Sequence, residues 1–516
     1  MKKIIIFTVS LFFVLLVGIV LYAATIRGVN YNPQISSIKE NLDQPTKPFE
    51  LSPERGRYLL TYSLAEDKSF SLSKKLADAA FPDVGYRNGK FYVYFAPGIS
   101  VLALPFYFVG KNFGFAQVTT YAMSAFFATV NLALLFLISK KVLKLPTWIA
   151  ILTALIFGFA STSWSYAITL YQHHVTTFFI LSGFYAGWKY KQENTYSWIY
   201  STYIWFSYGA ALFLDYPNAI LLAPVMIYHL ISSFKVQAQV KKLEVHFKTS
   251  YLLTSVAFVL LIGLHGYYNT VNFGGPLSLS GGLIGYKTIL EKNIQAKSDS
   301  KNIIKELQSE KEVKNFFKED RFPNGISILL ASRDRGLLLY APIFLLGFIG
   351  LMLALQTKTI ENYFLVGLVA VNFFLYSSWG DPWGGWAYGP RYLIPSMAVL
   401  SLFIGLFLSR MKKVAWRLST GIITFILFAY SSAVALLGAL TTNAVPPKIE
   451  ADFLKMNYNF MHNLIFFKNG QSGSFMFNTY FSKYVTLPQY FGLIWGSLLL
   501  VVFVLLFVAP WFEEKS

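Results

Sequence analysis

Carboxylates that could act as a general base stand at the ends of long apolar runs in this chain. The candidates are Glu54, Asp83, Asp215 and Asp381. A carboxylate placed beside a hydroxyl group can take its proton while the oxygen attacks an electrophile. The chemistry that these positions suggest is therefore activation of an acceptor hydroxyl.

Cationic and aromatic side chains alternate with these carboxylates. The cations are Arg57, Lys90, Arg333, Arg335 and Arg391, and the aromatic residues include Tyr58, Tyr92, Trp386 and Tyr388. Arg and Lys hold phosphate oxygens through charge-assisted hydrogen bonds, which suits a phosphate leaving group. Flat rings suit stacking against sugars or lipid headgroups. We add His173 and His174 to these as candidate binding residues.

Each candidate also has a purely structural interpretation. Trp and Tyr at helix ends commonly form an interfacial belt, and Arg391 could snorkel to the interface. Asp83 and Asp215 could cap helices or turns. The His173-His174 pair could simply begin a helix, and Glu54 could pair with a neighbouring arginine along a helix.

The composition indicates which elements must position these residues. Of the 516 residues, 55% are hydrophobic and only 13% are charged, whereas soluble domains carry about 25% charged residues. Such a chain cannot bury its apolar surface in a water-soluble core. The composition excludes a soluble enzyme, a disordered protein and a coiled coil, and predicts an all-α polytopic membrane protein.

Apolar stretches of about 20 residues mark the expected spans. We expect about twelve transmembrane helices, at residues 4–24, 118–139, 146–162, 173–188, 197–214, 218–233, 250–270, 336–355, 362–378, 391–409, 418–441 and 488–510. The first is expected to be a retained signal anchor, because it is longer than the apolar region of a usual signal peptide. With both termini inside, every candidate residue falls on the outer side.

The apolar piece at 95–110 contains Pro97 and Pro105 and is expected to lie along the membrane surface. If it crossed the membrane, Lys140, Lys141 and Lys144 would face outside, against the positive-inside bias. The same bias accounts for part of the net charge of +19. Because the positive residues are not clustered, nucleic acid is not an expected partner, whereas anionic membrane lipids are.

Three outer segments are long, at 25–117, 271–335 and 442–487. The first is expected to carry juxtamembrane helices, and the second an amphipathic helix in which Ile303, Leu307, Glu310 and Lys314 have helical spacing. We divide the chain into a catalytic transmembrane module, 1–441, and a final unit, 442–516, that holds the last outer segment and the last transmembrane helix. There is no Cys, and the six His show no zinc-site spacing, so neither a metal nor another cofactor is expected.

The order of the motifs resembles the GT-C superfamily of membrane glycosyltransferases over roughly residues 1–410. Its most similar branch is the protein O-mannosyltransferase-like one, which includes bacterial lipid A aminoarabinose transferases. The resemblance is carried by a first helix, an acidic residue near Arg57-Tyr58, and Asn88-Gly89-Lys90-Phe91-Tyr92 followed by Ala96-Pro97-Gly98. Phe95 stands where the family usually has a Lys.

The resemblance implies inverting transfer of a sugar from a polyprenyl-phosphate donor to a hydroxyl of a glycan, lipid or protein. Transfer would take place on the outer face of a bacterial cytoplasmic membrane, facing the periplasm. An acidic residue of the first outer segment would be the base: Glu54 matches the family position best, and Asp83 is its rival. The phosphate would be held by cations such as Arg57, Lys90, Arg335 or Arg391.

Two other classes of function fit parts of the pattern. A transporter or lipid flippase would show internal repeats and broken helices near the membrane midplane, but we find no repeat, and the polar residues gather at one face. A non-catalytic protein that binds polyprenyl lipids would keep the aromatic and cationic residues without needing Glu54 and Asp83. Replacing both carboxylates separates this alternative from an enzyme.

Overall fold

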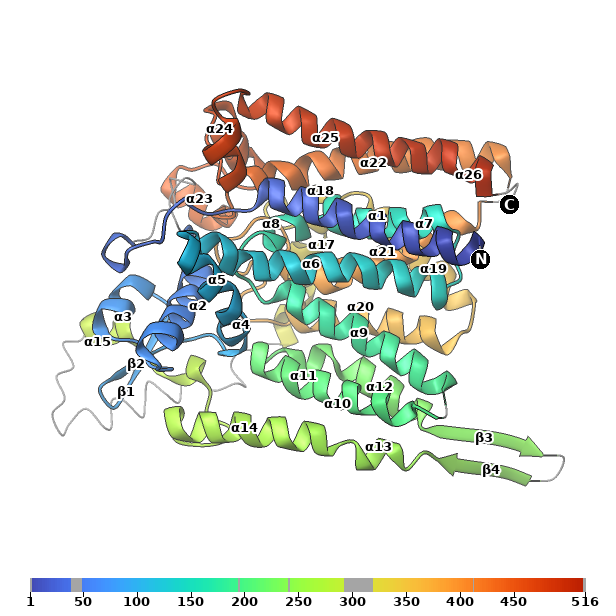
Figure 1. The fold of residues 1–516 in the computed structure, drawn as a ribbon, viewed down its shortest axis with the longest axis horizontal. Coiled ribbons are helices and arrows are strands. Elements are labelled where there is room, and N and C mark those ends of the chain that lie inside the picture. The colour runs from blue at the N-terminus through green and yellow to red at the C-terminus, as the bar shows by residue number, and fades with distance from the viewer. Residues whose placement is uncertain are drawn as a thin grey trace.

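The structure is a computed structural model that describes residues 2–38, 49–193, 195–239, 242–291, 319–411 and 413–513. It is mainly helical, and its long helices lie side by side along the longest axis of the molecule (Figure 1). The fold class expected from the composition is confirmed: the chain is a helical polytopic membrane protein. The segment with Ile303, Leu307, Glu310 and Lys314 lies outside the described residues.

Every expected span is helical in the structure. Single helices account for α1 (Lys2–Thr25), α6 (Ala116–Lys141), α7 (Thr147–Phe159), α9 (His173–Gln192), α10 (Ser197–Leu214), α20 (Ile360–Ser377), α21 (Ile394–Ser409) and α22 (Val414–Leu440). Among the described residues, seven helices are long and apolar enough to cross a membrane. Their length and composition support a multi-pass protein.

The remaining spans are interrupted helices. They are α11 (Asn218–Leu221) with α12 (Ala223–Ser232), α13 (Ser250–Leu253) with α14 (Val256–Phe273), α18 (Leu337–Tyr340) with α19 (Phe344–Gln356), and α25 (Leu487–Phe503) continued by a π-helical turn and α26 (Ala509–Glu513). Pro224 stands at the start of α12, where its missing N–H and fixed φ suit a helix start but not a helix interior.

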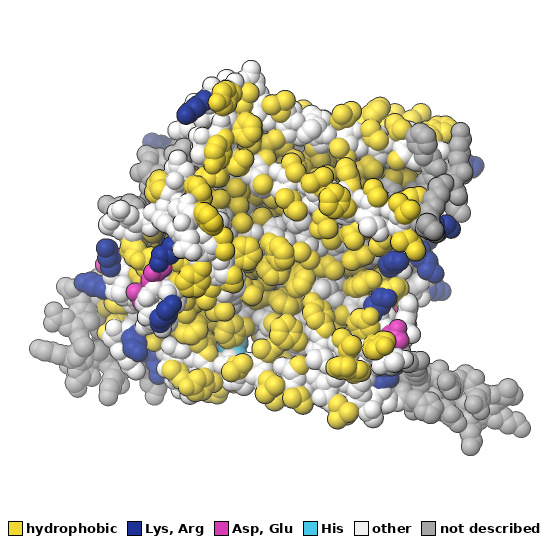
Figure 2. All heavy atoms as spheres, in the orientation of Figure 1, with side chains coloured by type: hydrophobic (Ala, Val, Ile, Leu, Met, Phe, Trp, Pro, Cys, Tyr) yellow, Lys and Arg dark blue, Asp and Glu magenta, His cyan; other side chains and the backbone are white. Residues whose placement is uncertain are grey.

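A broad hydrophobic surface covers the middle of the molecule, and charged side chains gather at its two ends (Figure 2). Residues Ser250–Phe273, which form α13 and α14, illustrate this middle zone: only 6% of their most apolar 18-residue stretch is buried inside the protein. An apolar helix this exposed is stable against lipid tails and not against water. The distribution fits a membrane that surrounds the long helices and leaves the two ends in water.

Both chain termini lie at one end of the molecule, together with the hairpin of β3 (Phe234–Gln239) and β4 (Lys242–Phe247) (Figure 1). The opposite end carries α2 (Ser52–Tyr62), α3 (Lys74–Ala80), α23 (Lys448–Leu454) and α24 (Phe460–Lys468). We call this opposite end the loop end.

The loop end also holds an antiparallel sheet that the sequence analysis did not predict. Strand β1 (Val84–Arg87) pairs with β2 (Lys90–Val93) and with β5 (Ile284–Gly285) from the second long outer segment. A hairpin turn at Asn88-Gly89, both with positive φ, joins β1 to β2. The sheet therefore ties the first two outer segments together.

The piece expected along the membrane surface forms α4 (Gly98–Leu102) and α5 (Leu104–Phe113). Five and ten residues are too few to cross the bilayer. Helix α5 packs back along the start of α6, because a Cβ added at Gly110 would meet the Thr119 side chain and the rings of Phe106 and Phe126 are 6.3 Å apart. The short helices thus support the loop end and do not add a span.

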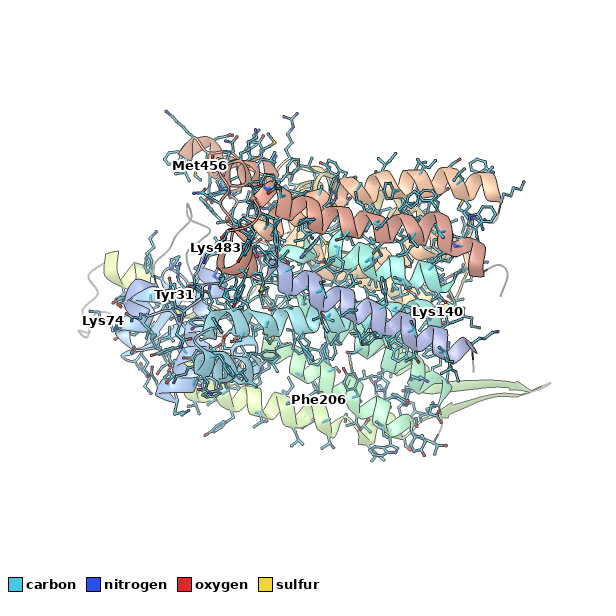
Figure 3. All side chains as sticks on the ribbon, turned by 45° about the horizontal axis from the view of Figure 1, so that its top comes forward. Tyr31, Lys74, Lys140, Phe206, Met456 and Lys483 are labelled. Carbon is cyan, nitrogen blue, oxygen red and sulfur yellow. The ribbon has the colours of Figure 1, made fainter. Side chains whose placement is uncertain are left out.

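Cysteine labelling tests which end faces outside. Lys74 at the loop end and Lys140 at the other end lie far apart in Figure 3. In the native Cys-free chain, we expect a Cys at exposed Lys74 to react with an impermeant maleimide in intact cells. A Cys at Lys141, next to Lys140, should react only after permeabilisation. The reverse pattern would contradict the expected orientation.

Candidate functional site

Helix α2 positions the central residues of the site. Pro53 lies in its first turn, and the Glu54 carboxylate accepts the backbone N–H groups of Glu50 at 2.7 Å and Leu51 at 3.4 Å. A carboxylate at a helix start satisfies orphan N–H groups and complements the helix dipole. Three of the four residues from Glu54 to Arg57 are charged, yet α2 is buried from Glu54 to Thr61.

The Arg57 side chain extends from α2 toward the start of α9. Its Nη2 donates to the side-chain oxygen of Gln172 at 2.8 Å, and the Gln172 amide donates to Asp215 at 2.9 Å. The guanidinium lies 4.3 Å from the ring centre of Phe95. Burial lowers the pKa of Arg57 to about 10, and Asp215 opposes this shift. A buried cation, a half-buried amide and a half-buried carboxylate therefore form one chain of contacts.

Arg391 approaches the same place from the loop before α21. Its Nη2 donates to the Gly384 carbonyl at 2.8 Å, and Gly384, Gly385 and Gly389 all have positive φ. A Cβ at Gly389 would also meet the Thr162 side chain at 2.6 Å. Glycine is therefore required there, and it lets the loop fold tightly enough to present Arg391.

The two guanidiniums both lie near one ring, that of Tyr171. The Arg57 and Arg391 guanidinium carbons lie 5.7 and 5.3 Å from the ring centre of Tyr171. His173 stacks on the same ring, with ring centres 5.9 Å apart and planes inclined by 10°. The Arg57 Nε and His173 Nε2 atoms have no hydrogen-bond partner within the described part of the chain. We call Arg57, Tyr171, Gln172, His173, Asp215 and Arg391 the two-arginine site.

Glu54 accepts the backbone N–H of a second acidic residue, Glu50. Burial raises the pKa of Glu54 to about 7, and the nearby Glu50 carboxylate adds to the rise. Burial also raises the pKa of Asp215, while Arg57 works against that rise. The pKa of each of these two carboxyl groups is thus closer to neutral pH than that of an exposed carboxyl group.

Other predicted residues of the first outer segment lie in its packing or on its surface. Tyr58 is buried against Phe49, with ring centres 4.8 Å apart. Tyr92 packs edge-on against Phe273, and Lys90 is exposed beside the hairpin turn. Asp83 accepts the hydroxyl of Ser52, the first residue of α2, at 2.5 Å.

The predicted residues of the later loops mainly hold those loops together. Buried Arg335 donates to the carbonyls of Asp334, Trp383, Gly385 and Val445, at 2.9 to 3.0 Å. Asp381 accepts the Gly385 N–H, the Trp386 indole donates to Glu450, and the Tyr388 hydroxyl donates to the Val434 carbonyl.

His174 lies next to His173, and its Nε2 is 2.8 Å from the Ser163 carbonyl. Arg333 is exposed. Functional roles for all these residues remain predictions, and within the described residues no group of three or more His, Cys, Asp or Glu could hold a metal ion.

Glu50 and Arg27 were not singled out from the sequence. Arg27 forms a buried ion pair with Glu50, and Glu50 also accepts the Asn443 N–H at 2.9 Å. Nothing in the spacing of these three residues brings them together, since they stand far apart in the chain. The position of Arg27, a charged residue shortly after an apolar span, was the feature of the sequence that could have indicated a role for it.

The Arg335 contacts predict a stability effect that separates it from its neighbour. Arg335→Ala leaves several buried carbonyls without a donor, so we expect a loss on the order of 3 kcal/mol. Arg333→Ala, at an exposed side chain two residues earlier, should change stability little. Thermal unfolding of both variants in detergent measures this loss of stability. Equal melting temperatures would contradict the role of Arg335 in holding these carbonyl groups together.

These observations define a helical polytopic membrane protein with a buried, cation-rich site at its loop end. No family model matches the chain, and no curated protein matches it. Similar solved structures include the oligosaccharyltransferase AglB from Archaeoglobus fulgidus, in complex with an inhibitory peptide and a dolichol-phosphate, at 12% identity and TM-score 0.48. That alignment covers 87% of this chain and 57% of AglB, so the chain spans little more than half of its length.

A second similar structure is ArnT from Cupriavidus metallidurans bound to undecaprenyl phosphate. It is 11% identical with a TM-score of 0.47, and the alignment covers 98% of this chain and 76% of ArnT.

Proposed function

We propose that this chain is an inverting glycosyltransferase that moves a sugar from a polyprenyl-phosphate donor to an acceptor hydroxyl. The observation that carries the proposal is the approach of Arg57 and Arg391 to the Tyr171 ring, near the buried carboxylate of Glu54 and the half-buried carboxylate of Asp215. Two guanidiniums suit a phosphate dianion, and a carboxylate nearby suits a general base.

The donor's phosphate would be bound by Arg57 and Arg391. Each guanidinium carries five N–H donors. Arg57 donates to the Pro53 carbonyl at 3.1 Å and to Gln172, and Arg391 donates to the Gly384 carbonyl. The aromatic neighbours keep water away from the charges, which strengthens their attraction for an anion. The polyprenyl tail would lie along the apolar surface between the helices and the lipid.

The transfer step requires one base, which accepts the proton of the acceptor hydroxyl, and one leaving group, which is the lipid phosphate. Glu54 takes the proton of the acceptor hydroxyl as its oxygen forms a bond to the anomeric carbon. The bond between that carbon and the phosphate oxygen breaks, and the electron pair leaves with the lipid phosphate. The leaving group needs cations and no general acid, so Arg57 and Arg391 stabilise the charge that develops there.

Glu54 is the better candidate for the base because its pKa of about 7 lies near the operating pH. Asp83 stays the rival, since it accepts the Ser52 hydroxyl two residues before Glu54. The acceptor would be a glycan, lipid or protein on the outer face of a bacterial cytoplasmic membrane. No metal or other cofactor is assigned to the step.

The proposal is tested with purified protein in vesicles that contain polyprenyl-phosphate donors with different labelled sugars. We expect label to move from at least one donor to an added or endogenous acceptor hydroxyl, with inverted anomeric configuration. Donor binding without transfer in every combination would instead support a lipid-binding protein without catalysis. Movement of intact donor between leaflets without transfer would support a flippase.

A further inference from the structure

Two acidic residues flank the start of α2: Glu50 precedes the helix by two residues, and Glu54 lies in its first turn. The backbone N–H of Glu50 donates to the Glu54 carboxylate at 2.7 Å, which holds the Glu54 side chain against the Glu50 backbone. The Glu50 and Glu54 residues are only 4% and 2% exposed. Water therefore cannot screen the repulsion between their charges.

Glu50 is fixed by residues from opposite ends of the chain. Arg27, just after α1, forms an ion pair with Glu50 and also donates to the Gly438 carbonyl in α22. The N–H of Asn443, just after α22, donates to the same Glu50 oxygen at 2.9 Å. The Asn443 side chain in turn donates to the Ser165 carbonyl at 3.1 Å. Glu50 therefore connects the segment after α1 with the segment after α22.

The charges around the pair do not balance if both carboxyl groups are ionised. Arg27 is the cation in contact with Glu50, and it faces two carboxylates. From the other elements, Tyr121 of α6 and Tyr171 before α9 face Glu54 with neutral hydroxyls. On α2 itself, the Arg57 guanidinium is directed to the Pro53 carbonyl and to Gln172. Two buried carboxylates against one cation favour the uptake of a proton.

We infer that Glu50 and Glu54 hold one proton between them, and that Glu50 is a positioning residue that sets the charge facing the base Glu54. The role of Glu54 as base rests on the proposed function, whereas the shared proton rests on the geometry of the pair. Burial raises the pKa of Glu50 too, while Arg27 and the Asn443 N–H oppose that rise. These two contacts favour the ionised form of Glu50, so a proton held by the pair resides on Glu54, and Glu54 can act as the base once that proton has left. The last outer segment thus contributes to the site through Asn443.

Removing the Glu50 charge should make Glu54 more acidic. In Glu50→Gln the repulsion disappears and Arg27 loses its partner, and both changes favour ionised Glu54. The glutamine keeps an oxygen for the Asn443 N–H, and the backbone N–H to Glu54 is unchanged. Glu66→Gln is the matched control, because Glu66 also pairs with a cation, Lys111, but at a partly exposed position.

The experiment is an infrared titration of protonated carboxyl groups in the reconstituted full chain, with transfer rates measured over the same pH range. We expect a carboxyl band that titrates near pH 7 in the wild type and is absent in Glu54→Gln. In Glu50→Gln its midpoint should fall by at least about one pH unit, while Glu66→Gln leaves it unchanged. In Glu50→Gln, the fall of the transfer rate at low pH should shift to lower pH together with this midpoint.

An unchanged midpoint in Glu50→Gln would overturn the inference, as would a wild-type chain without a band near neutral pH. If Glu50→Gln does not fold, Glu54→Gln decides alone: a persisting neutral-pH band would show that the proton is not held by this pair. If the band behaves as expected but Glu54→Gln still transfers sugar, the shared proton stands and the assignment of Glu54 as base fails.

Discussion

Glu54→Gln is expected to abolish nearly all sugar transfer while leaving the protein folded and able to bind donor. The loss of a general base typically costs about 10²–10⁴ in rate, so we expect at least about a hundredfold fall. The glutamine oxygen can still accept the backbone N–H groups of Glu50 and Leu51 that the carboxylate accepts now. Single-turnover transfer at saturating donor measures the chemical step without the binding step.

Asp83→Asn is the matched comparison for Glu54→Gln. The Asp83 carboxylate accepts the Ser52 hydroxyl at 2.5 Å, and an asparagine oxygen can keep that contact. We expect a smaller loss, caused mainly by loosening of the loop before Lys90. If Asp83→Asn is inactive and Glu54→Gln is active, the two roles are exchanged. If both variants transfer at the wild-type rate, the carboxylate mechanism is wrong.

Arg391→Ala is expected to weaken use of the donor strongly. Hydrogen bonds to charged groups contribute about 1.5–3 kcal/mol each, which corresponds to roughly 10- to 100-fold in the binding constant. Arg391→Lys should lose less, because an ammonium keeps the charge but cannot bind phosphate through two parallel N–H groups. The apparent Kd for donor and the transfer rate are measured for both variants.

Arg410→Ala provides the control for Arg391→Ala. Arg410 is exposed directly after the other end of α21, so its loss should leave donor binding unchanged. Unchanged donor kinetics in Arg391→Ala would place Arg391 among interfacial arginines that only snorkel to the membrane surface.

Hydropathy was sufficient to place the long helices but not the structure between them. Each expected span is helical because about twenty apolar residues can satisfy their backbone in lipid only as a helix. The pairing of β1 with β5 could not be predicted, since it joins two outer segments whose short strands carry no strong alternation. Likewise, the α11–α12 break depends on local packing as well as on Pro224.

The sequence indicated the residue types of the site better than their individual surroundings. Arg57, His173, Asp215 and Arg391 were all proposed, and the structure brings them together around Tyr171. Arg335 has the same side chain as Arg391 but lies in a cage of carbonyls. Only tertiary contacts distinguish an arginine that holds a loop from one that can meet a ligand.

The most direct test of the proposed reaction is the ratio of lipid phosphate released to sugar transferred. It is measured in vesicles that contain labelled polyprenyl-phosphate sugar and an acceptor. We expect one polyprenyl phosphate per transferred sugar with the wild-type chain, and neither product above background with Glu54→Gln. Release of sugar and lipid phosphate at the same rate in Glu54→Gln, or binding of donor by the wild type with no release, would contradict the account.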